Sequence, residues 1–208
     1  MIERRIAHRP LPLPGTAPPA RGLFIDRWGT LLERPRRGWC ARFDDARFTP
    51  RAVETLFRAA QGGWKLYLVG NEDQVARGRV SDSSWQSFQE GLSAHLTAQG
   101  VHIQRDYACL DNPHTGLGRH KRDSVYLLPN TGAMYHAMQH DGISIADSWT
   151  IGDSTLELTA GWRAGSHIAG VLTGEAVRDE SLQVEPEILR ASLAEAVAEI
   201  LAGVAAAR

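Results

Sequence analysis

Short apolar segments alternate with longer amphipathic segments along most of the chain, and this alternation constrains the fold more than any other feature. The short segments read as buried strands and the longer ones as helices. Strands are expected at residues 22–26, 64–70, 101–110, 148–153 and 167–174, and helices at 49–63, 81–100, 131–142, 154–165 and 185–204. Strands that alternate with helices form βαβ units. The sequence therefore predicts an α/β protein with three Rossmann-like layers around a central, mostly parallel sheet.

The helix expected at residues 49–63 carries the clearest local signals. Thr49 is a suitable N-cap, Pro50 suits the first helical position, and glycines follow the last apolar residue. We expect this helix to start directly after Thr49.

The chain divides into an N-terminal arm and one domain. Residues 9–21 hold five prolines among small residues, so we expect an extended arm over residues 1–21. The rest of the 208 residues, of which 43% are hydrophobic, suffices for a single core, and residues 22–208 are expected to form one α/β domain. The arm could also reach a neighbouring subunit, which leaves a homo-oligomer open.

Charge and composition exclude several classes of partner. The formal net charge of −1 gives no overall field that would attract nucleic acid or an anionic membrane. No apolar run reaches the length of a membrane span, and the N-terminus has no apolar segment like that of a secretory signal. Two cysteines do not make a disulfide framework. We expect a cytoplasmic protein with reduced thiols.

Three of the predicted strands end at residues that could bind a ligand. They are Asp26, then Gly70 and Asn71, then Asp153 after Gly152. Ligands of open parallel sheets bind beyond the carboxyl ends of the strands, so these residues should share one pocket. Two carboxylates repel each other unless a cation or a proton lies between them, and Mg²⁺ prefers such oxygen ligands. The alternative is structural, with Asp26 in a turn and Asp153 capping the next helix.

Three motifs carry a family resemblance. The segments "FIDRWGTLL", "YLVGNEDQVARG" and "TIGDSTLE", in this order, resemble the haloacid dehalogenase superfamily of phosphohydrolases, and most closely its capless branch of histidinol-phosphate and heptose-bisphosphate phosphatases. The similarity covers residues 22–174. The resemblance implies hydrolysis of a small phosphate ester, with Mg²⁺ as cofactor. There is little room for a large cap domain, so loops such as 33–48 and 110–124, or a partner subunit, should select the substrate.

The resemblance also assigns roles to residues. Asp26 would be the nucleophile that forms an aspartyl-phosphate. The metal would be held by Asp26, the backbone carbonyl of Trp28, Asp153 and Glu157. Backbone N–H groups of Gly70 and Asn71 could bind the phosphoryl group. Arg77, in the retained Ala-Arg-Gly element, either holds phosphate or carboxylate at the pocket mouth or is a surface arginine at a helix end.

Two departures from the family pattern weaken the expected catalysis. Trp28 stands where the family has its general acid–base carboxylate, and indole offers only an N–H donor. Trp28 is therefore either a stacking platform for a ring-bearing ligand or a plug that fills the space of the lost acid. Another acid could replace it, the candidates being Glu33, Asp44 and Glu72.

The second departure concerns the lysine that neutralises phosphate charge in the family. Leu127 and Leu128 occupy its segment, while Lys121 and Arg122 lie a few residues upstream and could reach in as a catalytic cation and a phosphate ligand. The alternative is that this basic cluster is a solvated loop. Relatives also often bind structural zinc here, but only Cys109 remains of the cysteines that would bind it, so we expect no zinc.

Three hypotheses follow from the sequence. The first is an active Mg²⁺-dependent phosphatase of the sugar-phosphate type that lacks its usual acid. The second is a catalytically impaired binding or regulatory protein on the same fold. The third is a phosphotransferase, in which Asp26 passes its phosphate to an acceptor other than water.

Overall fold

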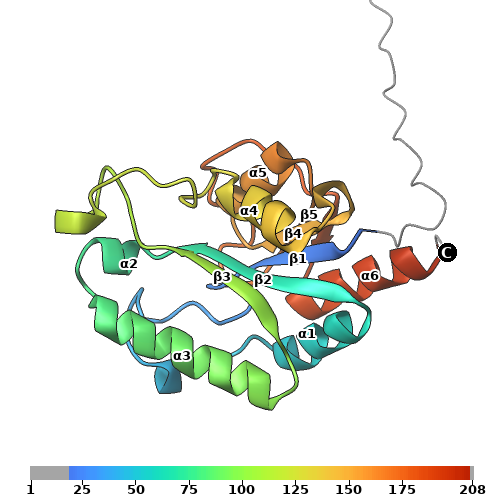
Figure 1. Ribbon diagram of the computed structural model, residues 1–208, viewed down its shortest axis with the longest axis horizontal. Coiled ribbons are helices and arrows are strands. Elements are labelled where there is room, and N and C mark those ends of the chain that lie inside the picture. The colour runs from blue at the N-terminus through green and yellow to red at the C-terminus, as the bar shows by residue number, and fades with distance from the viewer. Residues whose placement is uncertain (1–18, 207–208) are drawn as a thin grey trace, which may run out of the picture.

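The protein is a six-stranded parallel sheet between two layers of helices (Figure 1). The computed structural model describes residues 19–206, and side chains as far as residue 203. The strand order is β3-β2-β1-β4-β5-β6, and every neighbouring pair is parallel. The strands are β1 (Arg21–Asp26), β2 (Trp64–Asn71), β3 (Ile103–Cys109), β4 (Trp149–Gly152), β5 (His167–Val171) and β6 (Ile188–Arg190). The helices are α1 (Ala52–Gln61), α2 (Asp73–Ala76), α3 (Asp82–Ala98), α4 (Gly132–Asp141), α5 (Thr155–Ala164) and α6 (Leu193–Ala206).

The two faces of the sheet bury separate cores. In β1, Leu23 and Ile25 belong to the core beneath α1, α3 and α6, while Phe24 belongs to the core beneath α4 and α5. This alternation follows from the two-residue period of a strand. Figure 1 shows the same division, with α1, α3 and α6 on one side of the sheet and α4 and α5 on the other. The predicted three-layer α/β architecture is confirmed.

The strand order determines where a ligand can bind. The chain first builds β1, β2 and β3 outward on one side, then returns to place β4 on the other side of β1. In sheets of this order the ligand crevice lies beyond the carboxyl ends of the strands at this reversal. The connection from β1 to α1 contains only one short 3₁₀ helix, Phe43–Asp45, and no cap domain. No helix in residues 19–206 is long and apolar enough to cross a bilayer.

Two helix boundaries differ from the prediction. Helix α1 begins at Ala52, preceded by Arg51 in a left-handed conformation with φ 61°. Thr49 does not cap it, because its hydroxyl donates to the backbone oxygen of Thr30 at 2.7 Å and so fixes the loop that follows β1.

The single helix predicted over residues 185–204 was wrong. Residues 188–190 form β6, which pairs with β5, and α6 starts at Leu193 after Ser192 accepts a hydrogen bond from the Glu195 N–H at 3.3 Å. Tertiary pairing therefore overrides the helical spacing of Ile188 and Leu189. The predicted proline-rich arm falls mainly on residues 1–18, outside the described residues.

Candidate functional site

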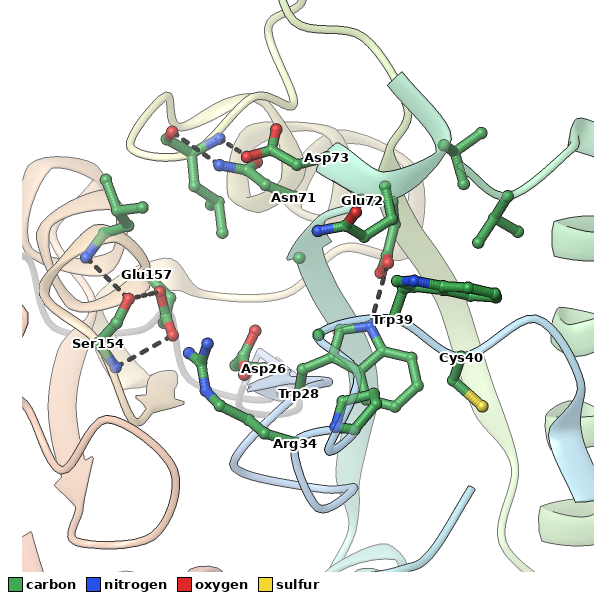
Figure 2. Close-up of a pocket in the computed structure, with 18 of the residues that line it drawn as sticks. Asp26, Trp28, Arg34, Trp39, Cys40, Asn71, Glu72, Asp73, Ser154 and Glu157 are labelled. Atoms are coloured by element: carbon green, nitrogen blue, oxygen red, sulfur yellow. Dashed lines mark hydrogen bonds between the residues drawn. The ribbon is translucent and has the colours of Figure 1, made fainter. Parts of the chain in front are cut away.

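A cavity of about 350 Å³ lies at the carboxyl ends of β1, β2 and β4. Side chains from the loop after β1, from the end of β2 and from the start of α5 line it. Figure 2 shows Asp26, Arg34 and Glu157 on one side of this cavity and Trp28 and Cys40 on the other. Asp26 and Glu157 thus face the aromatic ring of Trp28 and its partner Glu72 across the cavity.

Three buried carboxylates converge beside the cavity. Asp26 ends β1, Asp153 follows β4, and Glu157 lies in the first turn of α5. Their ligand oxygens lie within 4.8 Å of one another. Burial raises the pKa of Asp26 well above its ordinary value, and the charges of Glu157 and Asp153 raise it further. Burial likewise raises the pKa of Glu157 to about 7, with Asp153 adding to the rise and the Ser154 hydroxyl opposing it.

Two oxygens of this cluster indicate whether the three carboxylates are suited to bind a metal ion. Within the described residues, neither Asp26 Oδ2 nor Asp153 Oδ1 has a hydrogen-bond partner, although both are buried. Leaving a buried charged acceptor unsatisfied costs about 1–3 kcal/mol or more. A divalent cation between these oxygens would satisfy both and remove the repulsion between the carboxylates. The donor set therefore fits a hard cation such as Mg²⁺.

Glycines leave the room that Asp153 requires. Gly29 has φ +96° and Gly174 has φ +57°, and a Cβ on either would lie 2.2 or 2.0 Å from Asp153 Oδ2. The Asp153 carboxylate therefore lies between two backbone segments, and only glycine at positions 29 and 174 leaves room for it.

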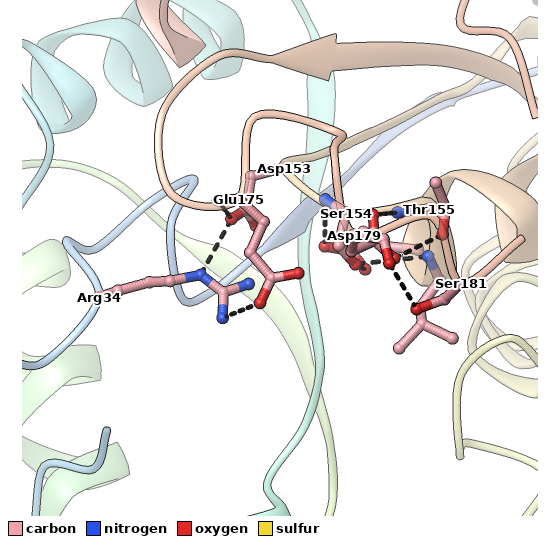
Figure 3. A network of polar contacts seen from close by, with 9 residues as sticks. Arg34, Asp153, Ser154, Thr155, Glu175, Asp179 and Ser181 are labelled. Atoms are coloured by element: carbon pink, nitrogen blue, oxygen red, sulfur yellow. Dashed lines mark hydrogen bonds and ion pairs between the residues drawn. The ribbon is translucent and has the colours of Figure 1, made fainter. Parts of the chain in front are cut away.

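Glu157 also has a structural role. Its Oε1 accepts the Ser154 N–H at 3.2 Å and its Oε2 accepts the Ser154 hydroxyl at 2.5 Å, which completes a capping box at the start of α5. An ionised carboxylate has about four lone-pair sites, so a cap leaves capacity for a metal or a metal-bound water. Next to it, the Asp179 carboxylate accepts the Thr155 N–H and hydroxyl, as Figure 3 shows.

Trp28 is held on the side of the cavity opposite Asp26 and Glu157. Its indole N–H donates to Glu72 Oε2 at 3.0 Å, and its ring centroid lies 5.4 Å from that of Phe88. The half-buried ring forms part of the cavity wall.

Glu72 lies at the centre of a buried polar cluster that sequence reasoning missed. The fully buried Arg27 forms ion pairs with Glu72 and Asp106, and its guanidinium lies over the Trp85 ring at 4.9 Å. Burial raises the pKa of Glu72, while Arg27 and the Trp28 indole oppose that rise. The signal available in the sequence was Arg27, a charged residue placed directly after the buried strand β1.

Gly70 and Asn71 lie where the sequence placed them, at the end of β2 and on the cavity wall. A Cβ on Gly70 would lie 3.5–3.6 Å from Arg27, Glu72 and Asp26, so the position has room for a side chain. The Asn71 side chain is engaged elsewhere, since it exchanges two hydrogen bonds with the backbone of Leu128, at 3.1 and 2.8 Å.

Three predicted cationic residues do not line this cavity. Arg77 is partly exposed and lies 3.6 Å from Asp73. Arg122 pairs with Asp111 at 2.9 Å within its own loop, and Lys121 is exposed. The cation that does line the cavity is Arg34, which sequence reasoning did not single out.

Arg34 extends from the loop after β1 towards the acids (Figure 3). Its Nε donates to Asp153 Oδ2 at 3.0 Å, and its Nη1 lies 2.7 Å from Glu175 Oε1. The pair with Asp153 joins residues 119 positions apart in the sequence. No local pattern could have revealed it.

Within the described residues, Asp26, Asp153 and Glu157 are the only converging group of three potential metal-binding side chains. Cys109 is buried, and its thiol donates to the backbone oxygen of Asp111 at 3.3 Å.

Comparison with known proteins finds sequence relatives that are named as phosphatases. No family model matches the chain. A D-glycero-beta-D-manno-heptose-1,7-bisphosphate 7-phosphatase of Haemophilus influenzae is 28% identical over 185 residues, 82% of this chain and 97% of the relative. A D-glycero-alpha-D-manno-heptose-1,7-bisphosphate 7-phosphatase of Burkholderia mallei is 28% identical over 70% of this chain and 76% of the relative.

Solved structures show the same fold. A D,D-heptose 1,7-bisphosphate phosphatase from B. bronchiseptica, complexed with magnesium and phosphate, has a TM-score of 0.76 at 19% identity, and the match covers 88% of this chain and 99% of that one. A haloacid dehalogenase-like hydrolase from Streptococcus pneumoniae has a TM-score of 0.57 at 12% identity, over 86% and 98% of the two chains.

A parallel sheet with acids at the ends of β1 and β4 defines a class of α/β protein with a candidate metal site at the carboxyl edge of its sheet. Within that class, the chain resembles the heptose-bisphosphate phosphatase branch of the haloacid dehalogenase superfamily, both in sequence and in fold.

Proposed function

We propose that this protein is a Mg²⁺-dependent phosphohydrolase that cleaves a small phosphate ester of the sugar-phosphate type. The observation that carries the proposal is the convergence of Asp26, Asp153 and Glu157, with two unsatisfied buried oxygens, beside an open cavity. These three side chains and the Trp28 backbone carbonyl would hold the metal. When bound, Mg²⁺ would neutralise charge on the carboxylates and on the phosphoryl oxygens.

Asp26 carries the covalent step of the proposed reaction. A carboxylate oxygen of Asp26 attacks phosphorus, the ester P–O bond breaks, and the leaving oxygen takes a proton. Water then attacks the aspartyl-phosphate and releases inorganic phosphate and free Asp26. The attack requires the ionised form, so the rise in the pKa of Asp26 that burial and its acidic neighbours cause must be reversed by a cation.

Protonation of the leaving oxygen is the weak point of this site. Trp28 does not supply the proton, and loss of such an acid costs about 10²–10⁴ in rate. Of the candidate replacements, Glu72 lines the main cavity, Glu33 lines only the neighbouring one, and Asp44 lines neither. Glu72 is committed to Arg27 and Trp28, so we expect a preference for esters with good leaving groups.

A second cavity supports the proposal that the substrate carries a second anionic group. It measures about 510 Å³, adjoins the first along Trp28, Arg34 and Trp39, and is lined by five arginines and two acids. Within the described residues, the guanidinium groups of Arg36 and Arg37 have no ion-pair partner. Relatives named for heptose bisphosphates act on sugars with two phosphates, and this cavity could bind the phosphate that is not cleaved.

Trp28 favours a second candidate function, a phosphatase fold that binds its ligand without turnover. Both candidates are tested by one screen of phosphate esters with Mg²⁺ or EDTA, using the wild type, Asp26→Asn and Trp28→Asp. Mg²⁺-dependent release of phosphate that Asp26→Asn abolishes supports the hydrolase. No turnover by the wild type, with turnover by Trp28→Asp alone or combined with Glu72→Gln, supports the binding protein. Transfer of phosphate to an added alcohol in place of water would indicate a phosphotransferase.

We also propose a cytoplasmic location and a small molecule as partner. Two free, buried thiols, Cys40 and Cys109, support the first. The cavity of about 350 Å³ beside Asp26 supports the second, and the near-neutral charge of the chain argues against nucleic acid as a partner.

A further inference from the structure

Arg34 separates the cavity from Asp153. Asp153 is fully buried and does not line the cavity, whereas Arg34, which pairs with it, does. Of the lysines and arginines in residues 19–203, Arg34 alone lines this cavity. A metal ion bound to Asp153 would therefore lie close to the guanidinium of Arg34.

The contact places Arg34 in competition with a metal. Asp153 Oδ2 already accepts the Arg34 Nε–H at 3.0 Å and the Glu175 N–H at 2.7 Å. Three carboxylates lie within 4.8 Å, and Arg34 is the cation that faces them from the cavity. A divalent cation and a guanidinium at this place repel each other, so binding of one weakens the contact of the other.

The geometry also leaves Arg34 able to bind an anion. A guanidinium has five N–H donors, and the ion pairs with Asp153 and Glu175 use two of them. The side chain is 42% exposed, so the remaining donors can reach the cavity. A guanidinium that faces a phosphoryl group can bind two of its oxygens at once.

We propose that Arg34 is the cation that holds the phosphoryl group in this protein, and that in the metal-free state it serves as an internal counter-ion for Asp153. It would take the place of the lysine of the family pattern, whose segment is occupied by Leu127 and Leu128 in this chain. With Mg²⁺ bound, the guanidinium of Arg34 would leave Asp153, and its freed donors would turn to the phosphoryl oxygens. This inference rests on the proposed function, because it assumes that phosphate binds beside Asp26.

The test is a pair of titrations by calorimetry on the full chain. Mg²⁺ alone is titrated first, and inorganic phosphate is then titrated at saturating Mg²⁺. Arg34→Ala removes the cation, Arg34→Gln keeps much of the side chain without its charge, and Arg58→Ala, on the exposed face of α1 and paired with Glu54, is the control. Thermal melts confirm that each variant folds.

The two affinities should change in opposite directions. We expect both Arg34 variants to bind Mg²⁺ several-fold tighter and phosphate roughly 10- to 100-fold weaker, since a charge-assisted hydrogen bond of this kind is lost. The Arg58 variant should match the wild type. Unchanged phosphate affinity, or weaker binding of both ligands, would overturn the inference, as would a wild type that binds neither ligand. A wild type that binds both but releases no phosphate from any ester would refute hydrolysis and leave the role of Arg34 intact.

Discussion

Gly174 offers a direct test of whether Asp153 belongs to a metal site. The residue lies beyond β5 with φ +57°, and a Cβ there would lie 2.0 Å from Asp153 Oδ2 and 2.8 Å from the Cα of Gly29. Non-bonded carbon contacts are favourable at about 3.5–4.0 Å. Gly174→Ala must therefore displace the Asp153 carboxylate, or the backbone on either side of it.

A matched control separates this clash from backbone strain. Gly142, the residue that ends α4, has φ +64°, and a Cβ there would meet nothing within 4 Å. Alanine in the left-handed region costs about 1–2 kcal/mol at either position. Overpacking adds about 1–3 kcal/mol at Gly174 alone. The difference between the two variants therefore reports the contact with Asp153.

The assay combines urea unfolding in EDTA with calorimetric titration of Mg²⁺. We expect Gly142→Ala to lose about 1–2 kcal/mol of unfolding free energy and to bind Mg²⁺ as the wild type does. Gly174→Ala should lose more, and its Mg²⁺ affinity should fall at least tenfold, which corresponds to about 1.4 kcal/mol. Equal Mg²⁺ affinity in the two variants would refute the assignment of Asp153 as a metal ligand.

Four further outcomes are expected. Asp26→Asn abolishes phosphate release and lowers the rise in melting temperature caused by Mg²⁺; retention of both would exclude Asp26 from the site. In EDTA, the unfolding free energy falls by up to about 3 kcal/mol as the pH rises from 5 to 8. The reason is that the pKa of Glu157 is 4.5 ordinarily and about 7 in the folded chain, so the folded chain holds a proton that the unfolded chain has lost. Urea titrations that are flat with pH would contradict this. Arg36→Ala raises KM for substrates with a second anionic group and leaves KM for simple monoesters unchanged. Combining Trp28→Asp with Glu72→Gln speeds cleavage of esters with poor leaving groups by about 10² or more, measured against a good leaving group as control.

The sequence was sufficient to predict the architecture because the relevant signals are local. The apolar strands and the polar residues that end them placed Asp26, Asn71 and Asp153 at one edge of a parallel sheet, and the structure brings their elements together there. The start of α6 could not be predicted in the same way. Ile188 and Leu189 fit a helix by spacing, and only pairing with β5 makes them a strand.

The charged groups of the site were harder to predict than its carboxylates. Lys121 and Arg122 lie near the expected segment in sequence, but the loop that carries them is fixed by its own polar contacts, including His120 between Asp111 and Asp82. Arg34 reaches the acids through a loop whose path no periodicity describes. An ion pair between distant segments depends on the tertiary fold, so a motif comparison cannot supply it.

The pairing of Trp28 with Glu72 explains why the acid must be restored with two substitutions. The Trp28 indole donates to Glu72 Oε2, and Arg27 neutralises the other oxygen of the same buried carboxylate. Trp28→Asp alone removes a donor and brings a second carboxylate towards Glu72, so repulsion raises the pKa of one of the two groups and can turn the new side chain away from the cavity. Glu72→Gln removes that repulsion, but it also leaves Arg27 with Asp106 as its remaining acidic partner. We therefore expect the double variant to be faster than Trp28→Asp, whereas Glu72→Gln alone should gain no activity. If Trp28→Asp alone matches the double variant, the two positions are not coupled and Trp28 serves only to fill the space of the missing acid.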